Sequence, residues 1–315
     1  MYYIGIDIGG TGIKAGVVKE NGEIIYKDSI PTQATADYKD LVKSMVELVN
    51  KVVADAGVSM DDIHSIGMGC PGSVDDKRGV VTYANNINLK NAPLCDEFKK
   101  YIDKPTYINN DANCAALGEF FALEDDSVSD FVAITLGTGV GGGIVINKKL
   151  YTGFNGTAGE LGHIVIDIDG ESCSCGRKGC WEAYSSATAI IRDTERAAKA
   201  NPDSIVAKLV AENGGKGSGK TAFVAMREGD AVGKAIVDNY IKHLAEGIAN
   251  IVNIFRPAVI AIGGGVSKEG DNLLIPLKEE YVKLCYGYGI VEPTELVVAK
   301  LGNDAGIVGA AFLGK

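Results

Sequence analysis

The stretch Asp7-Ile8-Gly9-Gly10-Thr11-Gly12-Ile13-Lys14 decides the fold class of this chain. The apolar run before it, residues 2–8, predicts a buried strand that ends in the glycine turn, and residues 13–18 predict the next strand. Glycines leave the backbone amides free of side chains, and the Thr11 hydroxyl stands beside them, so this turn is suited to phosphate oxygens. A tight turn without a ligand is the alternative.

Asp7 favours the ligand-binding interpretation. A carboxylate at the end of a buried strand is costly unless a cation or hydrogen-bond donors satisfy it. A nucleotide-bound Mg²⁺ would satisfy it through oxygen contacts, and Lys14 follows seven residues later, where it can meet the phosphates. The predicted nucleotide contacts in this segment are Asp7, Gly9, Gly10, Thr11, Gly12 and Lys14.

Two further glycine turns follow apolar strands. Residues 131–136 precede Gly137-Thr138-Gly139, and residues 258–262 precede Gly263-Gly264-Gly265. The order of strand, Gly/Thr turn and strand occurs at residue 7 and again about 128 residues later, at residue 135. This repetition predicts a duplicated fold.

The remaining pattern alternates helices and strands, which predicts an α/β protein. Apolar residues at helical spacing predict helices over 37–56, 112–123, 183–213 and 233–254, and further strands are expected at 23–26, 63–68, 107–109 and 144–146. The stretch 213–220 contains GGKGSGK and predicts a mobile loop. It is not a P-loop, because the spacing fails and no strand precedes it.

Length and charge limit the function classes. A chain of 315 residues predicts two domains, and 46% hydrophobic with 23% charged residues is typical of globular proteins. The net charge of -10 disfavours nucleic-acid binding. The longest uncharged run, 131–147, holds five glycines and predicts no membrane span. The N-terminus lacks the basic and apolar regions of a secretion signal, so we expect a cytoplasmic protein.

Three of the seven cysteines, Cys173, Cys175 and Cys180, fall within eight residues. Without a secretion signal, such crowding indicates a metal site rather than disulfides. His163 precedes them in the spacing H-x9-C-x-C-x4-C, although a core histidine is the default for a single His. We expect the other four to be buried free thiols: Cys70, Cys95, Cys114 and Cys285.

The glycine run resembles the phosphate-binding signature of the ROK sugar kinases, which belong to the actin/hexokinase ATPase clan. Further motifs match in the family's order over essentially the whole chain, and the cysteine motif is the most specific of them. They are Gly69-Cys70-Pro71-Gly72, Asn110-Asp111-Ala112-Asn113, residues 136–143, Glu160-Leu161-Gly162-His163, residues 173–182 and Gly263-Gly264-Gly265. The resemblance implies an actin-like, hexokinase-type fold of two α/β domains with the active site in the cleft between them.

The implied domains are a small one over residues 1–112 and a larger one over 113–303. The larger domain carries the cysteine motif and the second and third glycine turns. A final helix, about 304–315, is expected to pack back on the small domain. The family resemblance also implies a homodimer.

Within the family the resemblance is strongest to the glucokinases. It implies ATP- and Mg²⁺-dependent phosphorylation of glucose at O6, with Asp111 as the general base that takes the proton of the attacking hydroxyl. Taken alone, Asn110-Asp111 is better explained as a helix cap, and only the resemblance favours the base. The implied sugar contacts are Asn86, Asn110, Asp111, Glu160, His163 and Glu182; the implied nucleotide contacts add Gly137, Thr138, Gly139, Gly263, Gly264 and Gly265 to the first segment.

The resemblance also makes His163 the fourth ligand beside Cys173, Cys175 and Cys180. Thiolates with one imidazole suit tetrahedral Zn²⁺, and four protein ligands make a closed, structural site. With one ring nitrogen of His163 on zinc, the other is free to donate to a sugar hydroxyl.

One departure concerns the sugar. Many family members carry a tryptophan where this chain has Leu89, and Asn85 and Asn88 lie close enough to Asn86 to blur the register. Mannose, N-acetylmannosamine, N-acetylglucosamine and fructose therefore stay as alternatives to glucose. Other classes are a repressor, which needs a DNA-binding domain ahead of Tyr2, and a non-catalytic sugar sensor, which would lack Asp7, Asp111 or the glycine turns. Phosphoryl-donor range, oligomeric state and regulation are left open.

Overall fold

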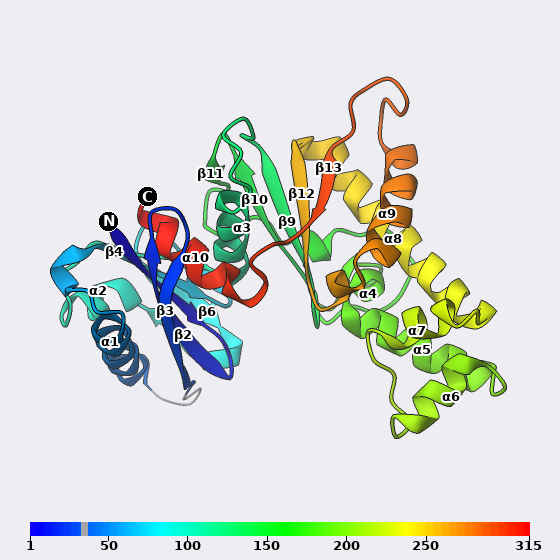
Figure 1. Ribbon diagram of the computed structural model, residues 1–315, viewed down its shortest axis with the longest axis horizontal. Coiled ribbons are helices and arrows are strands. Elements are labelled where there is room, and N and C mark those ends of the chain that lie inside the picture. The colour runs from blue at the N-terminus through cyan, green and yellow to red at the C-terminus, as the bar shows by residue number, and fades with distance from the viewer. Residues whose placement is uncertain (33–36) are drawn as a thin grey trace. The chain divides into compact units, whose positions relative to one another are not determined.

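The computed structural model describes residues 1–32 and 37–315, which divide into two compact units (Figure 1). Unit 1 consists of Met1–Ser127, Gly143–Gly159 and Lys300–Lys315. Unit 2 consists of Val128–Gly142 and Glu160–Ala299. Unit 1 thus continues past residue 112, the predicted end of the small domain, and its C-terminal segment begins at Lys300.

The sheet of unit 1 has the strand order β3-β2-β1-β4-β8. Its strands are β1 (Tyr2–Ile8), β2 (Gly12–Lys19), β3 (Ile24–Pro31), β4 (Ile63–Cys70) and β8 (Thr106–Asn110). The hairpin strands β1, β2 and β3 pair antiparallel, and β1, β4 and β8 pair parallel. The strands predicted in this region are confirmed, and β3 is longer than expected because it pairs with β2 as far as Pro31.

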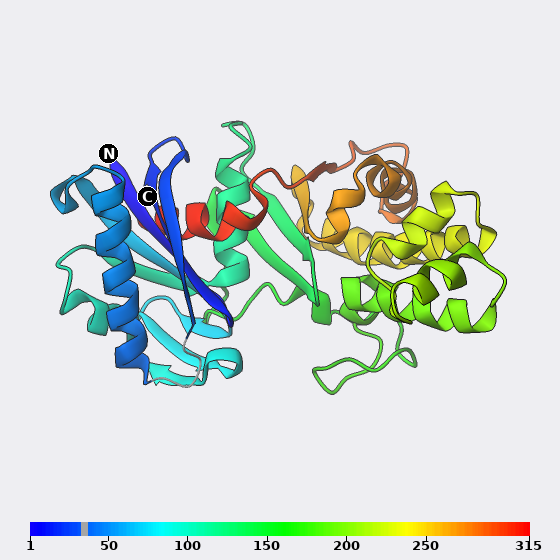
Figure 2. The same ribbon diagram turned by 60° about the horizontal axis from the view of Figure 1, so that its bottom comes forward.

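Helix α1 (Tyr38–Asp55) covers one face of this sheet (Figure 2). It begins where the Asp37 side chain accepts a hydrogen bond from Lys39 N at 2.8 Å. The predicted apolar stripe is buried, from Leu41 and Met45 to Leu48 and Val52. The helix expected over 37–56 is therefore confirmed, together with the side of it that faces the core.

Helices α3 (Asp111–Phe121) and α10 (Ala305–Ala311) pack together, and α10 lies on β1 and β4 at the opposite face (Figure 2). Glycines make this approach possible. A Cβ at Gly5 or Gly67 would lie under 3.0 Å from the backbone of α10, and one at Gly309 would lie under 3.0 Å from Cys114 O of α3. The contact between α3 and α10 explains why residues 113–127 belong to unit 1.

A small antiparallel sheet, which the sequence analysis did not predict, completes unit 1. It has the order β5-β6-β7, with strands β5 (Ser73–Asp75), β6 (Val80–Ala84) and β7 (Leu89–Ala92). The short turn Asn85–Ile87 joins β6 to β7, and α2 (Leu94–Lys99) follows. Leu89 is 3% exposed and belongs to the core of unit 1.

The second sheet has the order β11-β10-β9-β12-β13, and the division between the units falls within β10. Its strands are β9 (Phe131–Leu136), β10 (Val140–Ile146), β11 (Lys149–Leu150), β12 (Val259–Gly264) and β13 (Glu295–Val298). As in the first sheet, the central strands pair parallel (β9 with β12, β12 with β13) and the hairpin at the edge is antiparallel. The two sheets share one topology, so the predicted duplication is confirmed.

Unit 2 contains most of the helices. They are α4 (Glu182–Ser185), α5 (Ala187–Ala200), α6 (Ile205–Glu212), α7 (Thr221–Arg227), α8 (Ala231–Phe255) and α9 (Asp271–Leu284). The helical region predicted over 183–213 is three helices, and the predicted helix 233–254 lies within α8. Residues 213–220 form neither helix nor strand. In the described part of the chain, no helix combines the length and apolar character that a membrane crossing needs.

Trp181 joins the cysteine segment to α8. Its side chain is fully buried, and its Nε1 donates to His243 O at 3.0 Å. A Cβ at Gly247 would lie under 3.0 Å from the indole ring, so this glycine makes room for the ring against the helix. The cysteine segment is therefore anchored at its C-terminal end by a large apolar contact.

Candidate active site and metal centre

The carboxyl ends of three parallel strands meet in unit 1. In the register of β1 with β4, Asp7 pairs with Gly69, and in that of β4 with β8, Cys70 pairs with Asn110. Ligands of α/β sheets bind at this edge of the strands. The sheet therefore brings together the segments that hold Asp7, the Gly69–Gly72 turn and Asp111.

Asp7 is satisfied by Lys14 in the described structure. The Lys14 Nζ lies 3.2 Å from Asp7 Oδ2, and the two side chains are 43% and 20% exposed. A Cβ at Gly306, in α10, would lie 3.0 Å from Asp7 Cγ, so a glycine there gives the carboxylate its space. The group is a half-buried oxygen donor with solvent access, which is the kind of ligand that Mg²⁺ prefers.

The first glycine turn is held by backbone hydrogen bonds. Gly9 N donates to Gly12 O at 2.9 Å, and Thr32 Oγ1 donates to Gly9 O at 2.6 Å. A Cβ on Gly10 would lie 3.7 Å from Asn86 Cβ, so the small sheet places Asn86 beside this turn. A predicted sugar contact and a predicted phosphate turn are thus neighbours within unit 1.

Asn110 is the N-cap of α3. Its Oδ1 accepts hydrogen bonds from Ala112 N at 2.9 Å and Asn113 N at 3.3 Å, and its Nδ2 donates to Gly72 O at 3.0 Å. One Nδ2 hydrogen is left for a ligand. Asn110 therefore forms the helix cap of α3 that the sequence Asn110-Asp111 indicates.

Asp111 is the first residue of α3 and is half-buried. Its Oδ1 accepts a hydrogen bond from Ala112 N at 3.0 Å. Cys70 and Cys114 lie buried nearby, and burial, followed by the Asp111 charge, raises the pKa of both thiols. These thiols stay protonated and unreactive, as expected for buried free cysteines.

The second and third glycine turns lie side by side in unit 2, because β9 and β12 are parallel neighbours and Gly264 pairs with Leu136. Gly264 has φ +88°, and a Cβ there would lie under 3.0 Å from the Leu136 backbone. Thr188 Oγ1 donates to Thr138 O at 2.7 Å, and Ser267 Oγ donates to Gly264 O at 2.9 Å. Two of the predicted phosphate turns are thus brought together.

The two predicted sugar-binding glutamates of unit 2, Glu160 and Glu182, differ in exposure and in hydrogen bonding. Glu160 is exposed and directly precedes the short helix Leu161–His163. Glu182 is the first residue of α4, and its Oε2 accepts a hydrogen bond from Val140 N at 3.0 Å. The contact between Glu182 and the segment after Gly139 was not predicted, because Glu182 and Val140 are 42 positions apart and no sequence pattern links them.

The four predicted metal ligands form one cluster. The ligand atoms of His163, Cys173, Cys175 and Cys180 all lie within 4.8 Å of one another. Cys173 Sγ lies 3.6 Å from His163 Nδ1, and Cys175 Sγ lies 3.6 Å from Cys180 Sγ. A tetrahedral Zn²⁺ with Zn–S bonds of about 2.3 Å needs sulfurs about 3.8 Å apart. The chain alone already brings these atoms close to that spacing.

Two glycines shape the cysteine loop. Gly176 and Gly179 have φ of +88° and +72°, and a Cβ on Gly179 would lie under 3.0 Å from Asp167 O. A hydrogen bond from the Arg177 backbone lowers the pKa of Cys175, whereas burial raises that of Cys180 to about 12.

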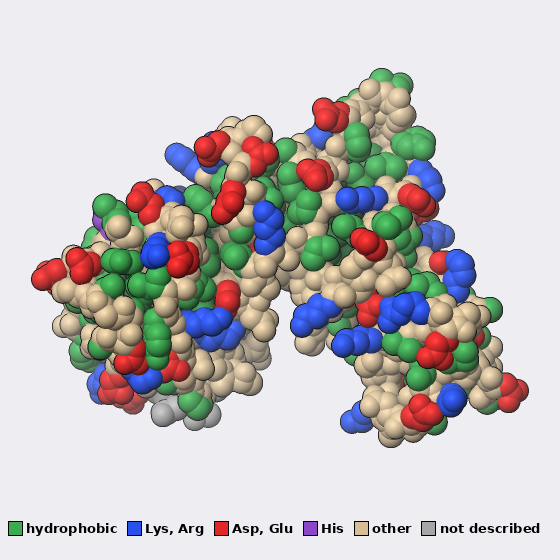
Figure 3. Space-filling model, viewed as in Figure 1, with side chains coloured by type: hydrophobic (Ala, Val, Ile, Leu, Met, Phe, Trp, Pro, Cys, Tyr) green, Lys and Arg blue, Asp and Glu red, His purple; other side chains and the backbone are tan. Residues whose placement is uncertain are grey.

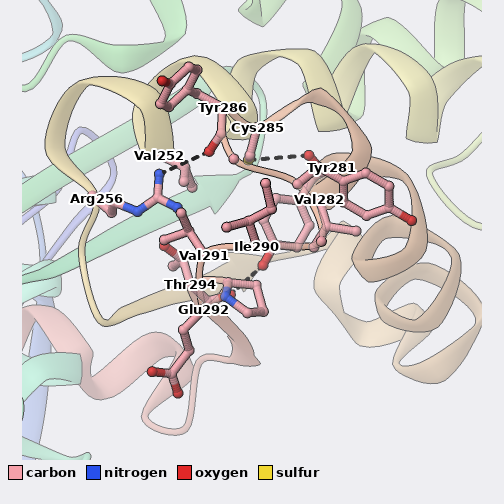
Figure 4. A pocket seen from close by; sticks show the side chains of 14 residues that line it. Val252, Arg256, Tyr281, Val282, Cys285, Tyr286, Ile290, Val291, Glu292 and Thr294 are labelled. Atoms are coloured by element: carbon pink, nitrogen blue, oxygen red, sulfur yellow. Dashed lines mark hydrogen bonds between the residues drawn. The ribbon is translucent and has the colours of Figure 1, made fainter.

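A separate hollow of unit 2 contains none of the predicted residues except Cys285. Its volume is about 400 Å³, and α8, α9 and the loop from 285 to 294 line it (Figure 4). Arg256 points into it and donates from Nη1 to Tyr286 O at 3.3 Å. Cys285 is half-buried here, so the expectation that it is buried is wrong; the thiol lines a cavity instead of the core. The sequence Tyr-Gly-Tyr-Gly-Ile signals a loop at 286–290 but not a hollow beneath it.

Two sheets of one topology, glycine turns after their strands and a Cys/His cluster define an α/β protein of the actin-like class. The chain belongs to the ROK family, whose model matches residues 3–315. A glucokinase of Halalkalibacterium halodurans is 38% identical over 315 residues, covering 100% of this chain and 95% of the relative. An N-acetylmannosamine kinase of Haemophilus influenzae is 34% identical over 317 residues, covering 99% and 95%.

Among solved structures, a ROK family glucokinase from Streptomyces griseus in complex with glucose and AMPPNP is 37% identical. The match covers 99% of both chains with a TM-score of 0.80. This likeness confirms the predicted fold class.

The capping role of Asn110 leads to a first prediction. Replacing Asn110 with Ala removes the cap, and we expect a loss of about 1 kcal/mol, or about 2–4 °C in the unfolding midpoint. Replacing Asn110 with Ser keeps a capping oxygen but, like Ala, loses the bond to Gly72 O. Thermal unfolding followed by circular dichroism should therefore rank the midpoints as parent, Ser, Ala. Equal midpoints for Ser and Ala would contradict the role of the cap.

Proposed function

We propose that this protein phosphorylates glucose at O6 with ATP and Mg²⁺, giving glucose 6-phosphate. The observation that carries the proposal is the position of Asp111, directly after β8, at the carboxyl edge of the unit 1 sheet, the edge at which β1 also carries Asp7. The full-length similarity to glucokinases, one of them solved with glucose and AMPPNP, supports glucose as the acceptor. Because the reaction consumes ATP and supplies a sugar phosphate for glycolysis, we propose that the protein acts in the cytoplasm.

In this proposal Asp111 accepts the proton of the O6 hydroxyl as that oxygen attacks the γ-phosphate. Its Oδ1 is already held by Ala112 N, which fixes the carboxylate at the start of α3. A positioned base contributes about 10²–10⁴-fold, and phosphoryl transfer depends otherwise on alignment and charge neutralisation. The proposed sugar contacts are Asn86, Asn110, Glu160, His163 and Glu182.

The nucleotide would be bound by the glycine turns. The turns at residues 9–12, 137–139 and 263–265 offer backbone amides to phosphate oxygens, apart from Gly9 N and Gly137 N, which donate within their own turns to Gly12 O and Gly139 O. Asp7 would hold the Mg²⁺, which neutralises charge on the phosphates, and Lys14 is close enough to Asp7 to contact the same group. Lys14 and Asp7 would then give up their ion pair, Lys14 to contact the phosphates and Asp7 to contact the Mg²⁺.

A structural Zn²⁺ is part of the proposal. The ligand set His163, Cys173, Cys175 and Cys180 supplies three thiolates and one imidazole at nearly tetrahedral spacing, which fits zinc. Because Nδ1 of His163 faces Cys173, its Nε2 is left to donate to a sugar hydroxyl.

The base assignment is tested by replacing Asp111 with Asn. We expect kcat to fall about 10²–10⁴-fold, since the amide cannot take the proton, while the KM for glucose stays within about threefold. Release of ADP should be measured in a coupled assay with ATP and Mg²⁺ against glucose, mannose, fructose and the two N-acetylhexosamines. The exposed Asp96 in the first turn of α2 provides the matched control, Asp96→Asn.

Turnover of the parent that is highest on glucose supports the proposal. A maximum on another sugar would keep the mechanism and replace the substrate, as the relationship to an N-acetylmannosamine kinase permits. No turnover with any sugar, in zinc-loaded protein, would favour a non-catalytic sensor. Near-parental kcat in Asp111→Asn would refute the base.

Zinc content is a further test. We expect about one zinc per chain by elemental analysis, because the cluster offers four ligands to one ion. Cys180→Ser should lose the metal and unfold at a lower temperature, whereas Cys285→Ser, outside the cluster, should retain it. Fully active protein without zinc would contradict the structural role.

We also propose a homodimer that uses the loop over 285–293. Tyr286 and Ile290 are 85% and 90% exposed, and Ile254, Tyr288 and Val291 add apolar surface around them. Figure 3 shows hydrophobic side chains at the surface of this loop, the uppermost part of the picture. Exposed apolar patches on soluble proteins commonly mark interfaces, and two copies of one patch complement each other in a two-fold dimer.

Light scattering after size exclusion should give twice the chain mass of 33.0 kDa for the parent at micromolar concentration. Ile290→Asp should give the mass of one chain, because it places a charge in the proposed interface. Phe154→Asp alters a side chain that is 94% exposed in unit 1 and should stay dimeric. A parent that elutes with the mass of a single chain would contradict the proposal.

A further inference from the structure

One carboxylate, that of Glu182, contacts both a glycine turn and the cysteine loop. Its Oε2 accepts a hydrogen bond from Val140 N at 3.0 Å, directly after Gly137-Thr138-Gly139. Its Oε1 accepts one from Ser174 Oγ at 3.3 Å and lies 3.8 Å from Cys173 Sγ. The two oxygens thus join two segments that the chain separates by more than thirty residues.

Gly139 leaves room for the Glu182 carboxylate. A Cβ on Gly139 would lie under 3.0 Å from Glu182 Oε2, whereas one on Gly137, in the same turn, would have nothing within 4 Å. Neither glycine has a positive φ. A side chain at Gly139 would displace the Glu182 carboxylate from its present position.

The rest of the turn is held from the neighbouring helix. Ala187 N donates to Gly137 O at 2.8 Å, and Thr188 Oγ1 donates to Thr138 O at 2.7 Å, both from the start of α5. Because each peptide unit is planar, these two bonds also orient the amides of Thr138 and Gly139. Glu182 orients the next peptide unit through Val140 N and so holds the end of a turn whose amides at Thr138 and Gly139 are suited to phosphate oxygens.

We infer that Glu182 is a positioning residue that couples the metal-binding loop to the nucleotide turn, so that loading the Cys/His cluster with zinc strengthens nucleotide binding. The inference rests on the proposed function, in which this turn binds ATP and Glu182 contacts the sugar. A zinc ion bound by Cys173 would restrain the neighbouring Ser174, whose Oγ donates to Glu182 Oε1, and Glu182 Oε2 accepts from Val140 N at the end of the turn. The family resemblance implies only a sugar contact for this glutamate.

Nucleotide binding without sugar separates the two roles. Calorimetry with Mg²⁺ and AMPPNP on zinc-loaded Glu182→Ala should show a dissociation constant raised about tenfold, the effect expected from losing a charge-assisted hydrogen bond. Glu182→Gln keeps an oxygen that can accept from Val140 N and should stay within about threefold of the parent. Glu160→Ala, which removes the other proposed sugar glutamate, should leave the nucleotide constant unchanged.

Removal of zinc provides the second arm. Treatment of the parent with a chelator should weaken AMPPNP binding about as much as Glu182→Ala does, and the same treatment of Glu182→Ala should add little, because the link is already broken. Additive effects of chelation and substitution would overturn the coupling. So would an unchanged nucleotide constant in folded Glu182→Ala.

A second variant covers the case in which Glu182→Ala does not fold. Ser174→Ala removes one hydrogen bond from Oε1 and leaves the carboxylate in place, and we expect a dissociation constant about threefold higher. An unchanged constant would overturn the inference. Failure of the proposed function has a different signature, since the parent itself would then bind no nucleotide or transfer no phosphoryl group to a sugar.

Discussion

The direct seating of α10 on the strands of unit 1 is the contact on which the position of the candidate catalytic groups depends. The helix comes close to the backbone of β1 at Gly5 and of β4 at Gly67, where no side chain intervenes, and Gly309 brings α3 equally close. Interiors packed this closely transmit small displacements. Strand β1, which carries Asp7 near its end, and helix α3, which begins at Asp111, therefore share one support, so their carboxylates are positioned by the same packing.

Unit 2 is organised by a corresponding anchor at the cysteine segment. Trp181 fills the space that Gly247 leaves on α8, and Cys180 and Glu182 stand on either side of it in the sequence. The buried indole of Trp181 fixes the backbone that carries Cys180, a predicted metal ligand, and Glu182, which binds the glycine turn. The apolar contact holds this segment in place, and the two polar neighbours carry its proposed functions.

Much of the fold could be predicted because the spacing of apolar residues along the chain indicates most of its strands and helices. Alternating and continuous apolar runs locate β1, β4, β9 and β12, and helical spacing locates α1 and α8. The small sheet was missed because its strands are three to five residues long and their pairing depends on contacts beyond the local pattern. Leu89 shows the same limit, because its burial depends on the pairing of β7 with β6.

Three ligands of the Cys/His cluster could be predicted because they are close in sequence, and the family resemblance added His163 as the fourth. The connection of this cluster to the glycine turn could not be predicted, since Glu182 and Val140 meet only through tertiary packing. The same holds for Asn86 beside Gly10, where the small sheet folds an exposed loop back to the first turn. A sequence motif therefore predicts a site whose residues are close along the chain, whereas contacts between two motifs can be seen only in the folded structure.

The observed role of Asn110 as a helix cap and its proposed role as a ligand contact are compatible. Oδ1 is committed to the amides of α3, which fixes the side-chain torsions, and the remaining Nδ2 hydrogen is thereby aimed in one direction. A free asparagine would lose rotamer entropy on binding a sugar, but a capping asparagine has lost it already on folding. The same argument applies to Asp111, whose Oδ1 is held by Ala112 N. Structural hydrogen bonds at the start of α3 therefore hold these side chains in fixed positions for their proposed roles in sugar binding and proton transfer.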